Sequence, residues 1–386
     1  MKRIICFTLT ALTALMARTA PQVFAQTRTA VTPERPYWFV LEEGKSKFRE
    51  GAYGDALLDF EDARNIRNAM YSQMEQDMID LLSRPDVRRY KDNLEMVDKF
   101  AREQGYLRAR DALDELYYRI DKNSLNNSVE KMLASFKKLR EYPEADYWIG
   151  EMYRVEGELV ISEKQYRKAL QGRDMLEPPG LALEIEYRLA SVLKEQRDYN
   201  GMEAAYENIM RSDTLWRESN GFARRAMART LKAEGIDRFL KFYRYTNPQT
   251  EAAHRELGFY YLETGRHGGA VEHLTFAVII QNSAIIGELA RREFDYEYKD
   301  LETLFASLER RKELKAYMED VDYYHTLYAL ADALYANGEE KTARGIWTVL
   351  SKTGEAGEWR GRALSQLRSP RVETAAAIPG NTAARR

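Results

Sequence analysis

The four histidines, His254, His267, His273 and His325, are the side chains best suited to hold a metal ion or to move a proton. Ligands on one helix must lie one turn apart to share an ion, and no two of these histidines have i, i+4 spacing. His254 lies one turn before Gly258, where we expect it to pack between helices. His267 and His273 are predicted to face solvent. The spacing therefore predicts no metal site.

Other sequences with chemical potential have a structural explanation. Gly44-Lys45-Ser46 resembles the end of a phosphate-binding loop, but Phe39 occupies the position of the upstream glycine. No serine has the Gly-x-Ser-x-Gly setting of a nucleophile elbow. The many carboxylates alternate with Lys and Arg, as on solvated helix faces. We therefore predict that the protein is not an enzyme and needs no cofactor.

Residues 251–278 are predicted to form two short amphipathic helices joined at Gly265. Each helix carries large apolar and small residues on one face at helical spacing. These are Leu257, Gly258 and Tyr261 on the first helix and Ala270, Leu274 and Ala277 on the second. A glycine on such a face lets the second helix approach closely. Because neither helix can bury its apolar face alone, we expect the two to pack together.

The same pattern recurs along the chain and resembles the tetratricopeptide repeat family. Well-matched residues include Leu41, Gly44, Phe48, Ala56, Phe60 and Ala63, then Ile149, Gly150, Tyr153, Tyr166 and Ala169, then Leu189, Ala190, Leu193, Tyr206 and Ile209, and finally Ala331, Leu334, Ala343, Trp347 and Leu350. The turns between paired helices are predicted at Gly51, Gly157, Arg197, Gly235, Gly265 and Gly338. The resemblance implies an all-α fold, a right-handed α-solenoid of stacked helical hairpins.

The spacing of the turns is regular in part of the chain. From Gly157 to Gly265 they follow one another at 40, 38 and 30 residues, against a family period of about 34. The next interval is close to two periods, so we expect a degenerate unit within 280–320. Its apolar residues would be Leu289, Phe294, Leu301, Phe305 and Leu308. The pattern fails from Arg64 to Tyr142, which leaves divergent repeats and an inserted bundle as alternatives.

The first 25 residues have the features of a secretory signal. Lys2 and Arg3 precede a short apolar segment, and Val23-Phe24-Ala25 suits a signal peptidase; an uncleaved N-terminal anchor is the alternative. Cleavage would remove the only cysteine, Cys6, and no acidic residue. It would change the formal net charge from −2 to −5 through the loss of Lys2, Arg3 and Arg18. That balance argues against nucleic-acid binding, and no membrane span is expected after cleavage.

These patterns predict six segments. They are a signal peptide at 1–25, a flexible leader at 26–36, an N-terminal repeat-like unit with divergent helical hairpins at 37–144, a repeat array at 145–350, a capping helix at 351–368 and a disordered tail at 369–386. Charged residues make up 31% of the chain and aromatic residues 11%. Such a composition is typical of a folded chain.

In the repeat family, ligands lie along an inner surface formed by the first helix of each pair. The resemblance places on that surface triplets at i, i+4 and i+7. They are Tyr147, Glu151 and Arg154; Tyr187, Ser191 and Lys194; Arg225, Arg229 and Lys232; Arg255, Phe259 and Leu262; and Tyr328, Asp332 and Tyr335. We expect their cations and aromatic rings to bind a protein segment with acidic character. Alternatively, the cations pair with Glu151, Glu195 or Glu263 and only solvate the helices.

The sequence thus predicts a protein-protein interaction scaffold in the periplasm or cell envelope, or a secreted one. Two other interpretations stay open. One is a cell-wall enzyme or its accessory subunit, since soluble lytic transglycosylases also contain a helical superhelix, although their Glu-Ser-x-Phe context is missing here. The other is a structural component that assembles with copies of itself.

Overall fold

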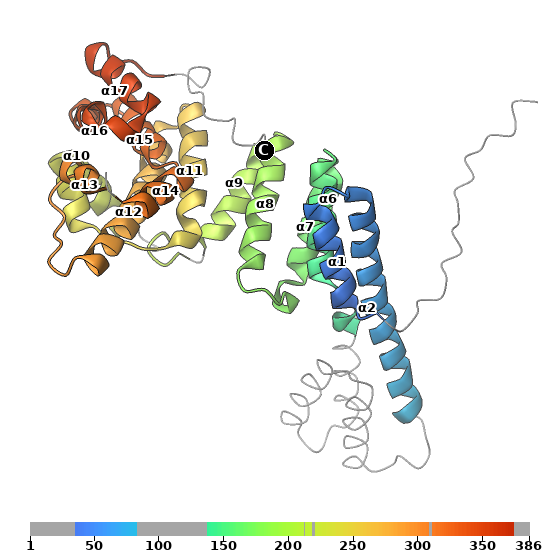
Figure 1. Cartoon of the computed structure of the whole chain (residues 1–386). Helices are drawn as coiled ribbons and strands as arrows, with labels where there is room; N and C mark the ends of the chain where they lie inside the picture. The colour runs from blue at the N-terminus through green and yellow to red at the C-terminus, as the bar shows by residue number, and fades with distance from the viewer. Residues whose placement is uncertain (1–34, 83–136, 212, 218–220, 309–310, 374–386) are drawn as a thin grey trace, which may run out of the picture. The chain divides into compact units, whose positions relative to one another are not determined.

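The computed structural model describes residues 35–82, 137–211, 213–217, 221–308 and 311–373 (Figure 1). Every regular element in these ranges is an α-helix or a short 3-10 helix, so the all-α prediction is confirmed for them. The predicted signal peptide, nearly all of the leader and most of the region where the repeat pattern fails lie outside the described residues. So does the tail beyond Glu373.

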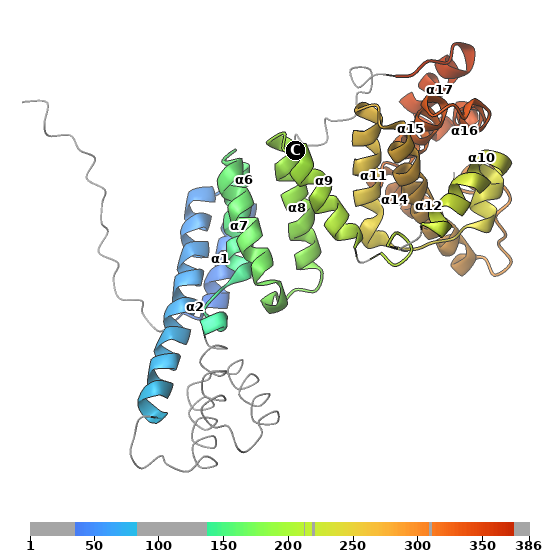
Figure 2. The same cartoon turned by 180° about the vertical axis from the view of Figure 1, so that it is seen from behind.

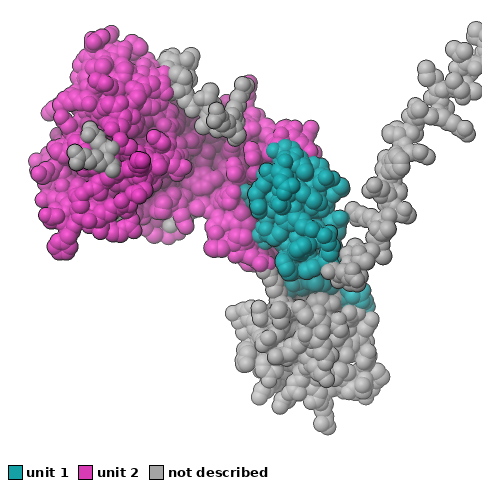
Figure 3. Space-filling view, in the orientation of Figure 1, with its two compact units in different colours: residues 1–149 teal, residues 150–386 magenta. Residues whose placement is uncertain are grey.

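The chain divides into two compact units, residues 1–149 and 150–386 (Figure 3). Unit 1 contains α1 (Tyr37–Arg49), α2 (Tyr53–Leu82) and the first half of α6 (Pro143–Val155). Unit 2 contains the rest of α6 and all later helices. The division therefore falls inside α6, close to the segment boundary predicted after residue 144.

In unit 1, α1 and α2 lie side by side as a helical hairpin (Figures 1 and 2). The chain reverses at Gly51, which has a left-handed φ of 80°. Gly44 permits the close approach of the helices, since a Cβ built on it would lie 2.6 Å from the Phe60 ring. Phe60 is fully buried. The first predicted pair thus packs through the glycine that the pattern singled out.

A buried arginine connects α2 to the segment that precedes α6. Arg67 is 1% exposed, and its guanidinium lies 4.6 Å from the ring centroid of Tyr142 and 5.2 Å from that of Tyr37. Its Nε donates a hydrogen bond to the backbone oxygen of Leu139 at 3.0 Å. A guanidinium is weakly hydrated and stacks on aromatic faces, so these rings offset part of its cost of burial.

Two more helical hairpins follow along the chain. The bounds of their helices after α6 are Leu159–Gln171 for α7, Leu181–Glu195 for α8 and Tyr199–Met210 for α9, with a 3-10 turn, η1, at Arg173–Met175. The turn within the second hairpin is Arg197, whose φ of 64° is left-handed. All six predicted turn residues have a positive φ, namely Gly51, Gly157, Arg197, Gly235, Gly265 and Gly338. The predicted turn positions are therefore confirmed.

The middle of unit 2 contains α10 (Phe222–Phe242), α11 (Pro248–Glu263) and α12 (His267–Arg292). Gly235 breaks α10 at φ 78° and ψ 177°, so two short helices meet there. α11 and α12 pack closely through Gly258, where an added Cβ would lie 2.5 Å from Leu274 Cγ. This confirms the helix pair predicted over residues 251–278.

α12 is much longer than the helix predicted for its position. It is long and apolar enough to cross a membrane, the only such helix in the described residues, yet 83% of its most apolar window is buried inside the fold. Buried polar groups lie in its second half. Gln281 Nε2 donates to Glu251 at 2.7 Å, and Asn282 Oδ1 accepts from the Tyr323 hydroxyl at 3.0 Å. These contacts are those of a core helix.

The last helices complete one core around α12. They are α13 (Leu301–Leu308), α14 (Lys312–Asp320), α15 (Tyr323–Ala336), α16 (Glu340–Lys352) and α17 (Glu358–Arg368), with the 3-10 turn η2 at Gly354–Ala356. α15 packs against both α12 and α16, and α17 packs against α16 and α15. The predicted capping segment, 351–368, thus ends at the last residue of α17.

The degenerate unit expected within 280–320 differs from the structure. No inter-helix turn follows the first half of α12, which continues to Arg292, and α13 and α14 are short. Leu289, Leu301 and Leu308 are buried as expected, but Phe294 is fully exposed. Phe294 lies in the loop after α12, so it does not contribute to the core as the pattern predicted.

Candidate partner-binding site

Two unpaired cations mark the first half of α10. Arg225 and Arg229 are exposed, lie one turn apart on one face, and form no ion pair within the part of the chain that the structure describes. The third member of this predicted triplet, Lys232, is also exposed but lies 3.3 Å from a carboxylate oxygen of Glu339. The face of α10 therefore presents two positive charges without an ion pair among the described residues.

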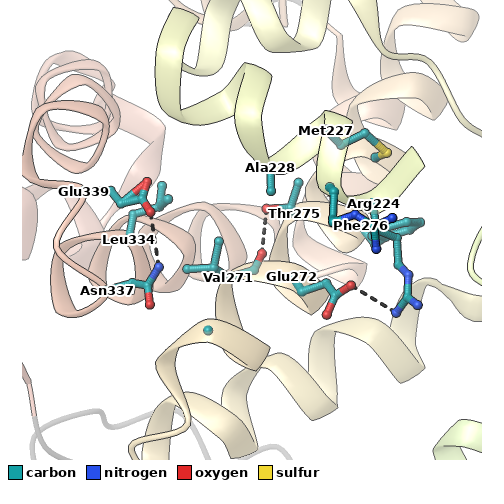
Figure 4. Close-up of a pocket in the computed structure, with 12 residues that line it drawn as sticks. Arg224, Met227, Ala228, Val271, Glu272, Thr275, Phe276, Leu334, Asn337 and Glu339 are labelled. Carbon is teal, nitrogen blue, oxygen red and sulfur yellow. Dashed lines mark hydrogen bonds and ion pairs between the residues drawn. The ribbon is translucent and has the colours of Figure 1, made fainter. Parts of the chain in front are cut away.

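A pocket of about 260 Å³ opens beside this face (Figure 4). Residues of α10, α12 and the turn between α15 and α16 line it: Arg224, Arg225, Met227, Ala228, Gly268, Val271, Glu272, Thr275, Phe276, Leu334, Asn337 and Glu339. Its apolar surface comes from Met227, Val271, Phe276 and Leu334. The pocket joins segments that lie more than a hundred residues apart in sequence, as the Lys232–Glu339 contact shows.

The polar groups of the pocket are largely used by one another. The Thr275 hydroxyl donates to the Val271 backbone oxygen at 2.6 Å, and Asn337 Nδ2 donates to Glu339 at 3.2 Å (Figure 4). Arg224 lies 3.1 Å from Glu272 (Figure 4). Arg225 is the cation of the lining that forms no ion pair among the described residues.

An aromatic cluster lies behind Phe276 and includes two of the histidines. His254 Nδ1 lies 3.1 Å from His273 Nδ1, and Trp216 contacts both rings. The guanidinium of Arg224 lies 4.7 Å from the Trp216 ring centroid and so connects this cluster to the pocket rim. Burial lowers the pKa of His254 well below its usual value, and burial together with Arg224 lowers that of His273 to about 3.

The prediction for His273 was wrong. Its side chain is 5% exposed, because α12 turns it toward His254 rather than toward solvent. His254 is fully buried between α11 and α12, as predicted, and His267 is half-buried. His325 lies 2.7 Å from Asp322 and stacks between Phe259 and Trp359. Within the described ranges, no group of three or more His, Cys, Asp or Glu side chains is placed to hold a metal ion.

The other predicted groove cations form ion pairs within the fold. Arg154 pairs with Glu151 at 2.9 Å, Lys194 with Glu256 at 3.0 Å, and Arg255 with Glu251 at 3.2 Å. Glu151 was a partner named in the alternative interpretation, whereas Glu195 and Glu263 were not found in these pairs. All three cations are therefore used within the fold, but only Arg154 pairs with a carboxylate that the alternative named.

The aromatic groove candidates differ in accessibility. Tyr147 is 3% exposed and Tyr328 is 1% exposed, so neither ring offers much area to a partner. Tyr187 uses its hydroxyl to donate to the Gln249 backbone oxygen at 2.7 Å. Phe259 is half-buried, with its ring centroid 4.2 Å from that of His325. Of these four candidates, none therefore has a fully exposed ring to offer to a partner.

No model of a known protein family matches the chain. An uncharacterized protein of Treponema pallidum (strain Nichols) is 26% identical over 333 residues, which cover 86% of this chain and 89% of that protein. An uncharacterized protein of Borreliella burgdorferi is 20% identical over 244 residues, or 57% of this chain and 75% of that protein. The chain and the Treponema protein therefore correspond over most of their lengths.

Two solved structures show remote similarity. BtubC (BKLC) from P. vanneervenii matches 82% of this chain and 99% of its own, with 14% sequence identity and a TM-score of 0.27. The TPR domain of P58(IPK) matches 87% of this chain and 99% of its own, with 14% identity and a TM-score of 0.18.

Proposed function

We propose that this protein is a non-enzymatic interaction scaffold of the bacterial periplasm or cell envelope. In this proposal the helical hairpins stack as a right-handed α-solenoid of the tetratricopeptide type, and the chain reaches its compartment through the signal sequence at its start. The basic start of that sequence, its apolar segment and the small residues before Gln26 support export.

The observation that carries the proposal is the pair of unpaired cations on α10. The other predicted groove cations pair within the fold, whereas Arg225 and Arg229 are exposed and form no ion pair in the described ranges. Exposed charges of one sign raise the rate and specificity of association with a partner of the opposite sign. The pocket beside them can accept an apolar side chain between Met227 and Val271.

The partner that fits this site is a protein segment that carries carboxylates around an apolar or aromatic anchor. The carboxylates would lie against Arg225 and Arg229, and the anchor would enter the pocket. A buried anchor gives most of the affinity in such interfaces, while charges at the rim act mainly on the association rate.

Crosslinking in the intact envelope, followed by mass spectrometry, would identify the partner. The affinity of the purified partner is then measured for the wild type and for Arg225→Glu/Arg229→Glu. We expect at least tenfold weaker binding and a smaller salt dependence. Arg238→Glu/Lys241→Glu changes the same number of charges beyond the break in α10 and serves as the control, with binding unchanged. Unchanged affinity and salt dependence in the first variant would overturn the proposed site.

The absence of enzymatic activity is tested separately. A peptidoglycan zymogram of the purified protein should show no clearing, because no catalytic carboxylate setting was found in the sequence. Clearing that persists through purification would instead support the cell-wall enzyme. The mature N-terminus, measured by mass spectrometry on protein from the envelope, should be Gln26.

A further inference from the structure

The residues that follow α17 form a short extended segment with specific contacts. We name Ser369–Glu373 the strap. The Gln366 side chain holds it by both atoms of its amide: Nε2 donates to the Arg371 backbone oxygen at 3.0 Å, and Oε1 accepts from the Arg371 backbone N–H at 2.9 Å. Gln366 itself is fully buried. A side-chain amide that hydrogen-bonds to both the N–H and the C=O of one residue recognises the backbone of an extended segment rather than its side chains.

Two further contacts fix the ends of the strap. The Tyr335 hydroxyl donates to the Pro370 backbone oxygen at 3.4 Å. At the other end Arg362 lies 3.3 Å from the Glu373 carboxylate, whose side chain is only 6% exposed. Arg371 lies 3.7 Å from the same carboxylate. The strap therefore has a backbone clamp at Arg371 and a charge contact two residues later.

The strap and α17 cover the part of α15 that the sequence placed on the partner-binding surface. Gln366 Nε2 lies 3.5 Å from the Tyr328 hydroxyl, and the Tyr328 and Trp359 ring centroids are 5.3 Å apart. Asp332, one turn after Tyr328, is 3% exposed, and the charge of Glu373 acts on it. Residues 369–373 thus lie on the fold, although we predicted them as part of a disordered tail.

We propose that the face formed by α15 and α17 is a peptide-binding site that the strap occupies in the resting protein. The partner that fits it is an extended protein segment with a carboxylate two residues beyond the residue clamped by Gln366. Such a segment would displace the strap and take its contacts with Gln366 and Arg362. This site is separate from the α10 face and does not depend on the function proposed there.

The chemistry of the contacts defines this partner. The Gln366 clamp requires a residue with a free backbone N–H, so the clamped position excludes proline. The Arg362 contact requires an acidic side chain and favours it through a charge-assisted hydrogen bond. An occupant tethered to the same chain has a high effective concentration, on the order of millimolar for a short linker. A competing segment must therefore bind more tightly than the strap or arrive with further contacts.

Photo-crosslinking with a peptide tests the proposal at low affinity. The probe is residues 368–373 of this chain with benzoylphenylalanine at the position of Val372, whose side chain is half exposed in the strap. The targets are the full chain and a chain that ends at Arg368. We expect labelling of α15 or α17 in the shortened chain, and at least tenfold less in the full chain. Arg362→Glu in the shortened chain should lower labelling about tenfold, whereas Arg360→Glu on the same helix should not.

Several outcomes would overturn the proposal. Equal labelling of the full and shortened chains would show that the strap does not occupy the face, and unchanged labelling with Arg362→Glu would exclude the carboxylate contact. If the shortened chain does not fold, Glu373→Lys in the full chain releases the strap instead and should raise labelling; no increase overturns the proposal. A full chain that forms a dimer in which each strap binds the other copy would also overturn the proposal, because the strap would then not occupy the face of its own chain. Loss of partner binding at Arg225 leaves each of these results unchanged.

Discussion

The Nδ1 atoms of His254 and His273 lie 3.1 Å apart and join α11 to α12 through two buried imidazoles. At this distance the Nδ1–H of one ring donates a hydrogen bond to the unprotonated Nδ1 of the other, an arrangement available to two uncharged rings. Phe276 stacks on His254, and Trp216 contacts both rings. Burial lowers the pKa of both histidines, to about 3 for His273.

The stability of the protein should therefore decrease in acid. In the unfolded chain the His273 imidazole takes up a proton near its ordinary pKa of 6.5, but in the folded protein it does so only near pH 3. The contribution of His273 to the free energy of unfolding is therefore fully present above pH 6.5 and is lost as the pH falls from 6.5 toward 3. We expect His254→Phe to reduce the loss, as measured by urea unfolding from about pH 7.5 to 5. His267→Asn at the first residue of α12 is the control, and an equal slope in all three proteins would contradict the prediction.

The close contact at Gly258 predicts a destabilising alanine substitution. An added Cβ would lie 2.5 Å from Leu274 Cγ, so α11 and α12 must move apart. We expect Gly258→Ala to lower the free energy of unfolding by about 1–3 kcal/mol. Gly287→Ala, on the exposed side of α12 with open space around it, should raise stability by about 0.5–1 kcal/mol. Thermal unfolding of the pair would expose an error if both substitutions changed stability in the same direction.

Arg197 occupies a turn position where the other five predicted turns have glycine. Its φ of 64° costs energy in a residue with a Cβ. We expect Arg197→Gly to stabilise the protein by roughly 0.5–1 kcal/mol, since the exposed side chain makes no packing contribution that must be replaced. Gly157→Ala, at φ 82° in the preceding hairpin, should lose a similar amount. A destabilising Arg197→Gly in urea unfolding would show that the strain is absent.

Asp332 predicts the opposite pH dependence from the histidine pair. Burial and the nearby Glu373 raise its pKa to about 8 from an ordinary value of 3.8. The contribution of Asp332 to the free energy of unfolding is therefore fully present below pH 3.8. It is lost as the pH rises toward 8, by up to about 1.4 kcal/mol per pH unit. Asp332→Asn should remove this loss and stabilise the protein at pH 7 more than at pH 5.

The measurement is the difference in unfolding free energy between Asp332→Asn and the wild type at both pH values. For the control Asp320→Asn, on the exposed end of α14, the difference from the wild type should be the same at pH 5 and at pH 7. If Asp332→Asn is less stable than the wild type at pH 7, the ionised Asp332 carboxylate stabilises the fold and the prediction is wrong.

Much of the fold could be predicted because local rules determine it. Positive φ at Gly51 and Gly265 follows from glycine at the end of an apolar helix pattern. The close packing at Gly258 follows from small and large residues at helical spacing. The length of α12 could not be predicted in this way, because its polar residues Gln281 and Asn282 form hydrogen bonds with side chains of other helices, Glu251 on α11 and Tyr323 on α15.

The site was predicted only in part for the same reason. Position on a helix face identified Arg225 and Arg229, but it could not show that Lys194 on α8 has a carboxylate partner, Glu256, on α11. The apolar lining of the pocket was missed, since it combines α10 and α12 with the turn after α15. The strap was missed because its contacts come from the Gln366 side chain and from backbone groups, which leave no apolar pattern.

The uninterrupted course of α12 has a consequence for how the protein unfolds. In an array of short hairpins, each unit touches only its neighbours and can open almost independently. α12 contacts α10, α11 and α15 at once, so none of these helices can detach without breaking its core contacts. Helices α10 to α16 should therefore open as one cooperative block, with uniformly slow hydrogen exchange. The helices of the α8–α9 hairpin are about half as long as α12. This hairpin should open as a separate block, with faster hydrogen exchange than α10 to α16.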